Sequence, residues 1–407
     1  MTDRPAGGDD EGRSAVRLAL LLTPGTLLAG VAGGIAFPIL PIVGLRLGLS
    51  LPFIGVILAA NRAMRVVSNP FVGMMADRAG GRRTLLVGLA IQVVVMSLYA
   101  LGIVTHRAGA LFLAGRLLHG VGSACVFVAA QALALHAGGH GTRRGGAAAA
   151  VRAAIVLGVP MGLFVGGLLS TAFGDAATFA VASAAVLVAF AAAWMTVPDL
   201  HAPGSLRSSR SETLRAMRDR RLLAVGGLNF ALSFAAGGMI LTTLALLVHH
   251  RHISVLGMND QGTSGLLMGV MTVADAAATP LAGRIGDRFR AHAHVATAAI
   301  AFLTPGLVLV GISTGVPGIA VGLVLVGLGG ACLGPSLLVI VGEIVPRERR
   351  GTGAGVLQLC GDLGGMAGPL VGTALFAGST TMPYLGTAAF VACFFPVAAW
   401  LASATGP

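Results

Sequence analysis

Charged residues are scarce in this 407-residue chain: 10% of its residues are charged and 56% are hydrophobic. Soluble domains carry about 25% charged residues, so the composition excludes an ordinary water-soluble protein. Lysine is absent, because all 27 basic residues are arginine. Without lysine there is no Gly-x-x-x-x-Gly-Lys phosphate loop, which argues against ATP as the energy source. The four cysteines lie inside apolar runs, which excludes a disulfide framework of the secreted type.

Apolar runs of about 20 residues, each long enough to cross a hydrocarbon core, recur along the whole chain. Helices satisfy their own backbone hydrogen bonds in lipid, and the runs are too uniformly apolar for barrel strands. The sequence therefore predicts an all-α membrane protein with twelve transmembrane helices, over residues 18–44, 51–75, 84–105, 109–135, 146–172, 176–197, 222–248, 262–283, 293–313, 317–341, 352–377 and 384–403.

The longest polar stretch separates the sixth predicted helix from the seventh. The expected organisation is a cytoplasmic tail (1–17), a six-helix bundle (18–197), a cytoplasmic central loop (198–221) and a second bundle (222–403). Loop arginines number twenty on the side of the termini and three on the other, which predicts cytoplasmic termini. The same loops account for the formal charge of +12, so the expected partner is the lipid bilayer and not nucleic acid.

An internal repeat relates the two halves. NPFVGMMADR (69–78) and TPLAGRIGDR (279–288) share Pro-x-x-Gly-x-x-x-Asp-Arg, at an offset of 210 residues. GVGSAC (120–125) matches GLGGAC (327–332), and a third glycine pattern matches between 144–167 and 350–373. Three matches in the same order indicate duplication of a six-helix unit.

With this repeat, the chain resembles the major facilitator superfamily over residues 17–403. The resemblance implies two pseudo-symmetric six-helix bundles, transport by alternating access, and a small-molecule site at the midplane between the bundles. A membrane enzyme would need a catalytic constellation in its loops, and the short, acid-poor outer loops offer none, so no enzymatic activity and no cofactor are expected.

The sharpest motif is the loop GMMADRAGGRR at residues 73–83. It resembles the superfamily's signature loop, Gly-xxx-Asp-Arg-x-Gly-Arg-Arg, except that Gly81 stands where a basic residue is usual. The resemblance implies that Asp77 lies near the start of the eleventh helix, around Gly351, where the helix dipole favours a carboxylate. The alternative is a loop that is only anchored at the headgroups. The candidate cytoplasmic gate, with its weaker second copy, comprises Gly73, Asp77, Arg78, Gly80, Arg82, Arg83, Asp287 and Arg288.

The fourth helix carries RLLHGVGSA, which resembles the superfamily's Arg-x-x-Gln-Gly-x-Gly motif with His119 in place of glutamine. An arginine within a span costs about 2.5–3.5 kcal/mol on insertion scales, so Arg116 is expected to face the bundle interior. The resemblance implies a role in proton coupling. A hydrogen-bond clamp to backbone carbonyls is the alternative.

The fifth helix carries GVPMGLFVGG, which resembles the Gly-xxx-Gly-Pro-xx-Gly-Gly motif of proton-driven exporters, with Leu163 at the proline position. Small residues at this spacing also allow close helix approach without any role in export. GIAFPILPIVG (34–44) resembles the opening helix of drug exporters, but it lacks the acid that many of them carry. The motif residues in the fifth helix are Gly158, Pro160, Gly162, Gly166 and Gly167.

A polar stripe runs along the second helix, where Arg62, Arg65, Asn69 and Gly73 fall within a sector of roughly 80°. In the superfamily helix 2 packs against helix 11 and helix 5 against helix 8. This packing places Asp362 opposite the stripe, and it pairs Asp275 in the eighth helix with Arg152 in the fifth.

Two interpretations of these charges stay open. Either they form ion pairs that stabilise one conformation and break in the other, or the surplus arginines bind an anionic substrate. The second interpretation leaves Asp275 or Asp362 as the proton carrier, because burial favours the protonated carboxyl group.

Two surface segments have simpler interpretations. HHRH (249–252) on an outer loop is expected to be a solvated cluster and not a metal site. SETLRAMRDRR (211–221) is expected to form an amphipathic helix at the membrane surface.

The sequence thus predicts a monomeric secondary transporter in a bacterial inner membrane, without cofactor or metal. The first hypothesis is an efflux antiporter that couples export of small organic molecules or drugs to protons. The alternative is a transporter of an organic anion or metabolite bound by Arg62 and Arg65.

Overall fold

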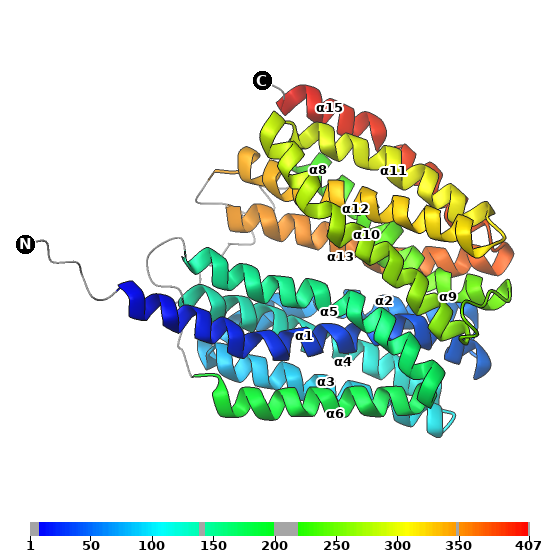
Figure 1. Cartoon of the computed structure of the whole chain (residues 1–407), viewed down its shortest axis with the longest axis horizontal. Helices are drawn as coiled ribbons and strands as arrows, with labels where there is room; N and C mark the ends of the chain where they lie inside the picture. Colours follow the sequence, from blue (N-terminus) through cyan, green and yellow to red (C-terminus); the bar gives the residue numbers. More distant parts are fainter. Residues whose placement is uncertain (1–7, 138–142, 199–218, 347–349, 406–407) are drawn as a thin grey trace, which may run out of the picture. The chain divides into compact units, whose positions relative to one another are not determined.

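The computed structural model describes residues 8–137, 143–198, 219–346 and 350–405 (Figure 1). Within these ranges the chain forms twelve helical passes and no strand, which confirms the predicted all-α fold. The first six passes are single helices: α1 Gly8–Arg46, α2 Leu51–Ala79, α3 Gly81–Val104, α4 Ala108–Ala137, α5 Arg143–Phe173 and α6 Asp175–Thr196.

The seventh and twelfth passes are composite. The seventh joins α8 (Arg220–Leu232), the π-helix η1 (Ser233–Ile240) and α9 (Leu241–His250), and the twelfth joins α14 (Met382–Ala392) and α15 (Phe395–Thr405). Between them lie α10 Asp260–Phe289, α11 His292–Ile312, α12 Val316–Ile344 and α13 Arg350–Gly378.

Eleven of the described helices are long and apolar enough to span a membrane, and α5 adds a shorter apolar stretch, Leu157–Phe173. One sequence-based expectation was wrong in part. Helix α1 begins at Gly8, ten residues before its predicted start at residue 18, so it extends into the predicted cytoplasmic tail. Once a helix is nucleated by a long apolar run, each added residue gains a backbone hydrogen bond, which favours extension. Residues 1–7 lie outside the described part of the chain.

The chain forms two compact units: residues 1–36 with 67–206, and residues 37–66 with 207–407. Helix α2 therefore contributes to both units. The predicted division into bundles at 18–197 and 222–403 stays a prediction.

In the first unit α3 packs along α4 and α6. Tyr99 is completely buried and makes edge-to-face ring contacts with Phe112 at 5.9 Å and with Phe179 at 5.2 Å. Helices α1 and α5 cross closely at Gly34 and Gly162, where a Cβ on either glycine would collide with a backbone carbonyl of the other helix. The motif in the fifth helix thus serves helix packing in this structure.

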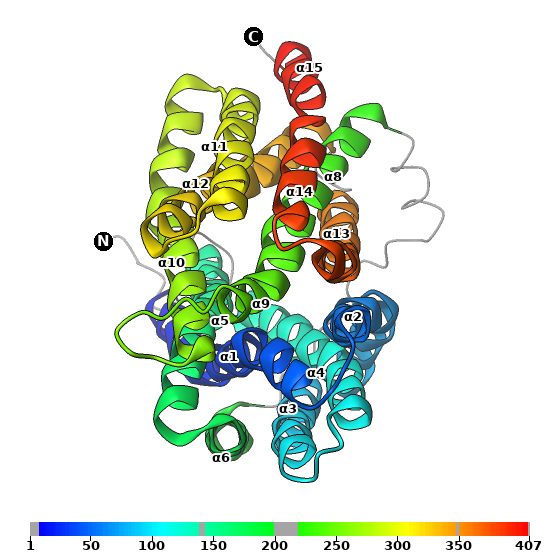
Figure 2. The ribbon, with the colours of Figure 1, turned by 90° about the vertical axis from the view of Figure 1, so that its right-hand side faces the viewer.

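In the second unit α11 packs along α12 and α14, and α13 packs along α8 and η1, as Figure 2 shows. Asn229 on α8 donates a hydrogen bond to the carbonyl oxygen of Leu357 on α13 at 2.7 Å. These contacts hold the seventh pass against the helix that carries Asp362.

Candidate functional site

Arg62 and Arg65 on α2 both bind the carboxylate of Asp362 on α13. Nη1 of Arg62 donates to Oδ1 at 2.9 Å, Nε of Arg65 donates to Oδ2 at 3.1 Å, and Nη2 of Arg65 donates to Oδ1. The two arginines are three positions apart on a helix, so they project from one face. All three residues belong to the second unit. The structure therefore brings together the pair of helices that the sequence analysis expected to face each other.

This ion cluster is buried on its acidic side and partly open on its basic side. The Asp362 side chain is 1% exposed, whereas those of Arg62 and Arg65 are 26% and 23% exposed. A buried carboxylate is costly unless it is paired and hydrogen-bonded, and here both carboxylate oxygens accept bonds from guanidinium groups. The partly exposed guanidinium groups can also meet water or a solute.

The surroundings of Arg62 were not predicted from the sequence. A Cβ on Gly365 of α13 would lie 3.3 Å from Cζ of Arg62, and a Cβ on Gly237 would lie 3.8 Å from Nη2. Gly237 belongs to the π-helix η1, and such segments occur often at functional sites. The pair Gly237–Gly238 inside an apolar run is the sequence feature that could have indicated an irregular helix here.

Asp275 lies apart from this cluster, on α10. It is partly buried, and its neighbours on α12 are Gly330, whose added Cβ would lie 3.4 Å from Cγ of Asp275, and Cys332. The Thr279 hydroxyl donates to the backbone carbonyl of Asp275 at 2.8 Å and lies 3.5 Å from its Oδ1. Among the described residues, Asp275 forms no ion pair. The side chain of Arg152, its predicted partner, lies outside the described residues.

In the first unit Arg116 is fully buried on α4, as an intramembrane arginine facing protein should be. Tyr99 of α3 interacts with it electrostatically. His119 is 5% exposed, and Gly33 of α1 lies against its imidazole ring. The roles of these residues in proton coupling stay predictions. The sequence analysis did not select Tyr99, although it is one of only two tyrosines in the chain.

The structure gives a packing reason for Gly81, the residue at which the signature loop departs from the superfamily pattern. Gly80 is the residue between the end of α2 and the start of α3, and its φ of 86° is a conformation that favours glycine. A Cβ on Gly81 would lie 2.7 Å from Cγ of Leu133, so packing against α4 leaves no room for the usual basic residue. Asp77 is partly buried, and its contact with the start of the eleventh helix stays a prediction. The gate roles of the remaining loop residues stay predictions as well.

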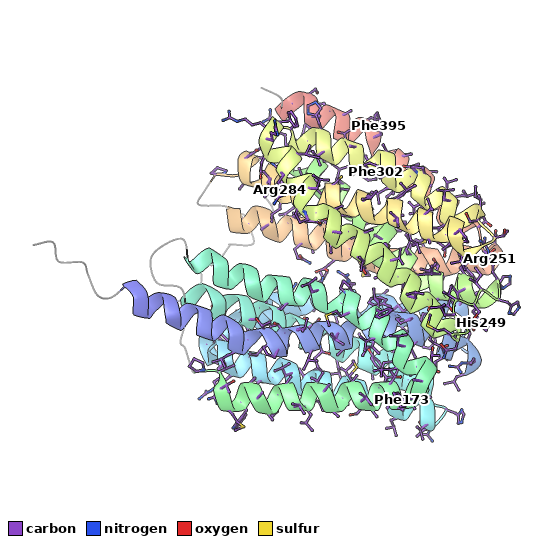
Figure 3. All side chains as sticks on the ribbon, in the orientation of Figure 1. Phe173, His249, Arg251, Arg284, Phe302 and Phe395 are labelled. Carbon is purple, nitrogen blue, oxygen red and sulfur yellow. The ribbon has the colours of Figure 1, made fainter. Side chains whose placement is uncertain are left out.

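In the second copy of the loop, Oδ1 of Asp287 lies 3.1 Å from Nε2 of His292, and Arg288 lies over the ring of Phe289. At the opposite end of α10, Oδ2 of Asp260 lies 2.6 Å from Nδ1 of His249, which is on α9. Figure 3 labels His249 and Arg251 in this region. No group of three potential metal ligands occurs in the part of the chain that the structure describes.

The two remaining residues of the α2 stripe, Asn69 and Gly73, are partly buried and belong to the first unit. Their roles in substrate binding and gating stay predictions. The predicted amphipathic segment 211–221 lies mostly outside the described residues, because the description resumes at residue 219.

Curated relatives match part of the chain. The synaptic vesicular amine transporter of Bos taurus is 27% identical over 194 residues, which is 47% of this chain and 36% of that protein. The transporter of the same name from Homo sapiens is 27% identical over 135 residues, which is 33% of this chain and 26% of that protein. The matched segments thus span about a third or less of these relatives' length.

Solved structures match over nearly the whole chain. The human organic anion transporter MFSD10 (TETRAN) is 20% identical, with a TM-score of 0.66, and the match covers 94% of this chain and 99% of that one. A mutant of the nucleoside transporter NupG is 14% identical, with a TM-score of 0.76, over 96% of this chain and 100% of that one. At these identities the similarity shows the fold.

The profile of the Major Facilitator Superfamily matches residues 22–262 and 230–407. These two overlapping matches include both halves of the internal repeat and nearly every described helix. Together with the helical passes, they establish that the chain belongs to the Major Facilitator Superfamily, which is a family of membrane transporters and not of enzymes.

Proposed function

We propose that this protein is a proton-coupled antiporter that exports small organic molecules by alternating access. One observation carries the proposal: Asp275 is a partly buried carboxylate within a membrane span, and it forms no ion pair among the described residues. An ionisable residue in such a place marks a candidate proton relay. Asp362 is a poorer candidate, because two arginines hold its charged form.

The packing around Asp275 supports a role in a conformational cycle. Gly327 and Gly330 let α12 approach α10 so closely that an added Cβ on Gly327 would lie 3.0 Å from the backbone nitrogen of Asp275. A small relative movement of α10 and α12 would therefore change how much water reaches the carboxyl group. Access to water from one side and then the other is what a proton carrier needs.

Export is favoured by the exporter-like motifs in α1 and α5. The curated relatives bear on the substrate class: their names describe amine transporters, so organic amines are the first substrates to test.

The direct test uses everted membrane vesicles with an acidic interior. Addition of organic amines should dissipate the pH gradient in a protein-dependent manner, and Asp275→Asn should abolish this response. Thr279→Val is the matched control, because it removes the neighbouring hydroxyl and leaves the carboxylate. A full response in Asp275→Asn would exclude Asp275 as the proton carrier, and no response to any amine or drug would exclude the proposed export.

The second candidate function is transport of an organic anion by Arg62 and Arg65. The supporting observation is the contrast in exposure, because the arginines are about a quarter exposed while Asp362 is buried. A substrate carboxylate could then exchange with Asp362 for the two guanidinium groups, whose fork geometry suits carboxylates. In the same vesicles an anion response that is lost in Arg65→Gln, with any amine response retained, would favour this alternative.

The remaining features of the proposal follow the arginine distribution and the signature loop. The protein would act as a monomer in a bacterial inner membrane, with both termini in the cytoplasm. Asp77 and the arginines of its loop would close the cytoplasmic side when the site opens outward.

A further inference from the structure

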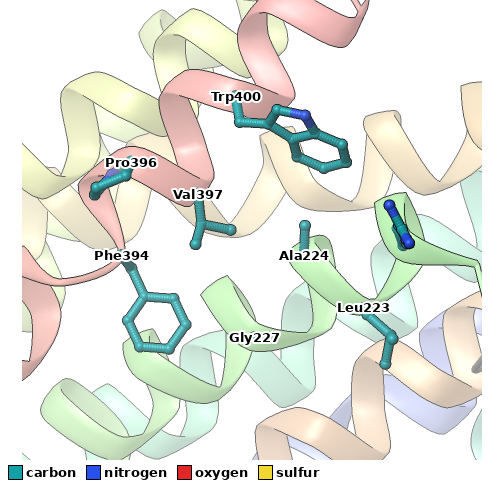
Figure 4. Close-up of a pocket in the computed structure, with 8 residues that line it drawn as sticks. Leu223, Ala224, Gly227, Phe394, Pro396, Val397 and Trp400 are labelled. Carbon is teal, nitrogen blue, oxygen red and sulfur yellow. The ribbon is translucent and has the colours of Figure 1, made fainter.

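A groove opens on the second unit between the start of α8 and α15, next to the break in the twelfth pass (Figure 4). Its volume of about 460 Å³ falls within the range of small-molecule sites, about 300–1,000 Å³. Leu223, Phe394, Val397 and Trp400 contribute apolar walls, and Arg220 contributes the one charged side chain. None of the residues that line the groove belongs to the proposed transport site.

Two features of the sequence keep the groove open. Gly227 on α8 has no side chain, and a Cβ there would lie 3.1 Å from Cε1 of Phe394. The twelfth pass is interrupted between Ala392 and Phe395, and Pro396 in the first turn of α15 has no backbone N–H to continue the helix from α14. The interruption turns Phe394 and Trp400 toward α8, as the close-up in Figure 4 shows.

The chemistry of the groove changes along its length. Trp400 is 44% exposed and Leu223 is 47% exposed, so both would face hydrocarbon in a membrane. Arg220 is exposed in the first turn of α8, where the span begins. Tryptophan and arginine at the end of a span are typical of the headgroup region. An apolar groove with a cation at its membrane-surface end matches a lipid with an acyl chain and a negatively charged headgroup.

Charge complementarity favours an anionic lipid over a zwitterionic one. Asp219 already caps the first backbone N–H groups of α8, accepting from Arg221 N at 2.8 Å and Leu222 N at 3.4 Å, so the guanidinium of Arg220 is the available cation at the groove. Arg221 follows directly and is also exposed, so two arginines lie where the span begins. Clusters of arginine beside a span attract anionic headgroups.

We propose that this groove binds one anionic phospholipid, with its phosphate at Arg220 and an acyl chain along Gly227, Phe394 and Trp400. The lipid comes from the leaflet on the arginine-rich side, which the loop charges predict to be cytoplasmic. Such a lipid fills the space beside the interrupted twelfth pass.

The two tryptophans of the chain, Trp194 and Trp400, make a direct test feasible. Trp194→Phe leaves Trp400 as the single tryptophan, which is excited selectively over the two tyrosines, and the full-length protein is reconstituted as single copies in nanodiscs. Brominated phosphatidylglycerol and brominated phosphatidylcholine are compared as quenchers at equal mole fractions. Phosphatidylglycerol should quench Trp400 with about fivefold higher apparent affinity, the factor that one arginine near an anionic surface provides.

Arg220→Gln should abolish this preference, whereas Arg221→Gln should retain it. The two arginines are adjacent and both are exposed, but only Arg220 lines the groove. Equal quenching by both lipids in the parent protein would overturn the proposal. Equal losses in both arginine variants would also overturn it, because they would indicate surface charge without a site.

A second variant tests the acyl part of the site. Ala224→Phe places a ring in the groove without changing its charge, since Ala224 lines the groove and is partly exposed. The preference for phosphatidylglycerol should fall in this variant, and an unchanged preference would contradict the proposed chain position. Weak quenching by both lipids in liposomes that hold several copies, with strong quenching by both lipids in the single-copy nanodiscs, would identify a second copy as the occupant and would overturn the lipid assignment. The experiment measures lipid contact and not transport, so a negative result would leave the proposed transport function untouched.

Discussion

Arg65 binds Asp362 through two nitrogens at once: Nε donates to Oδ2 at 3.1 Å, and Nη2 donates to Oδ1. This side-on arrangement uses the planar fork of the guanidinium, which a lysine cannot reproduce. Arg62 adds a single bond to Oδ1 at 2.9 Å. The carboxylate is thus held from two sides while it is almost fully buried.

Asp362→Asn should destabilise the protein, because it leaves two guanidinium groups together without their carboxylate. Breaking a buried pair costs roughly 3–5 kcal/mol, and the partial exposure of the arginines reduces the expected loss to about 2 kcal/mol. Thermal unfolding in detergent measures it. The double variant Arg65→Gln/Asp362→Asn should recover part of the loss, and strictly additive effects would contradict a direct interaction.

Asp275→Asn should separate coupling from substrate binding. With the carboxyl group replaced by an amide, proton-driven accumulation should be lost, while exchange of labelled for unlabelled substrate across the membrane should continue. Counterflow in proteoliposomes without a pH gradient measures the exchange. A variant that loses counterflow and gradient-driven transport together would place Asp275 in substrate binding or folding.

Gly162→Ala should destabilise the first unit by about 1–3 kcal/mol, the usual cost of overpacking. Its Cβ would collide with the Val31 carbonyl and would lie 2.9 Å from Cα of Gly34. Gly334→Ala on α12 is the matched control, because an added Cβ there meets nothing within 4 Å. The control should gain up to about 1 kcal/mol from helix propensity. Equal unfolding temperatures for the two variants would show that the α1–α5 crossing adapts.

Arg251→Gln should destabilise the end of the second unit where α9 meets the end of α11 more than His249→Gln does. The Arg251 guanidinium donates to the carbonyl oxygens of Gly311, at 2.7 Å, and Ser313 at the end of α11. Hydrogen bonds from a charged group contribute about 1.5–3 kcal/mol. The His249–Asp260 pair is 40% and 34% exposed, so its loss should cost at most about 1 kcal/mol.

Unfolding temperatures of the two loop variants, measured in one detergent, provide the comparison. A metal chelator should leave both temperatures unchanged. A larger effect of the histidine variant, or a shift on adding chelator, would point to a metal-dependent loop.

The sequence by itself determined the helical passes and the faces of several of them. Apolar run length is a local property matched to the thickness of a bilayer, so α3 and α11 begin and end within three residues of their predicted limits. Helical periodicity also placed Arg62 and Arg65 on one face. The mutual orientation of α2 and α13 required the resemblance to a known fold, because spacing along one helix does not specify the helix opposite.

Only the tertiary structure decided which helices approach closely enough to exclude a side chain. Packing of α3 against α4 explains why Gly81 replaces a basic residue, and packing of η1 against α13 places Gly237 beside Arg62. The grouping of residues 37–66 with the second unit makes the Arg65–Asp362 bond internal to that unit. The groove at Trp400 depends on an interruption in one helix and a missing side chain in another. These features depend on contacts between residues far apart in the sequence, and local patterns do not encode such distances.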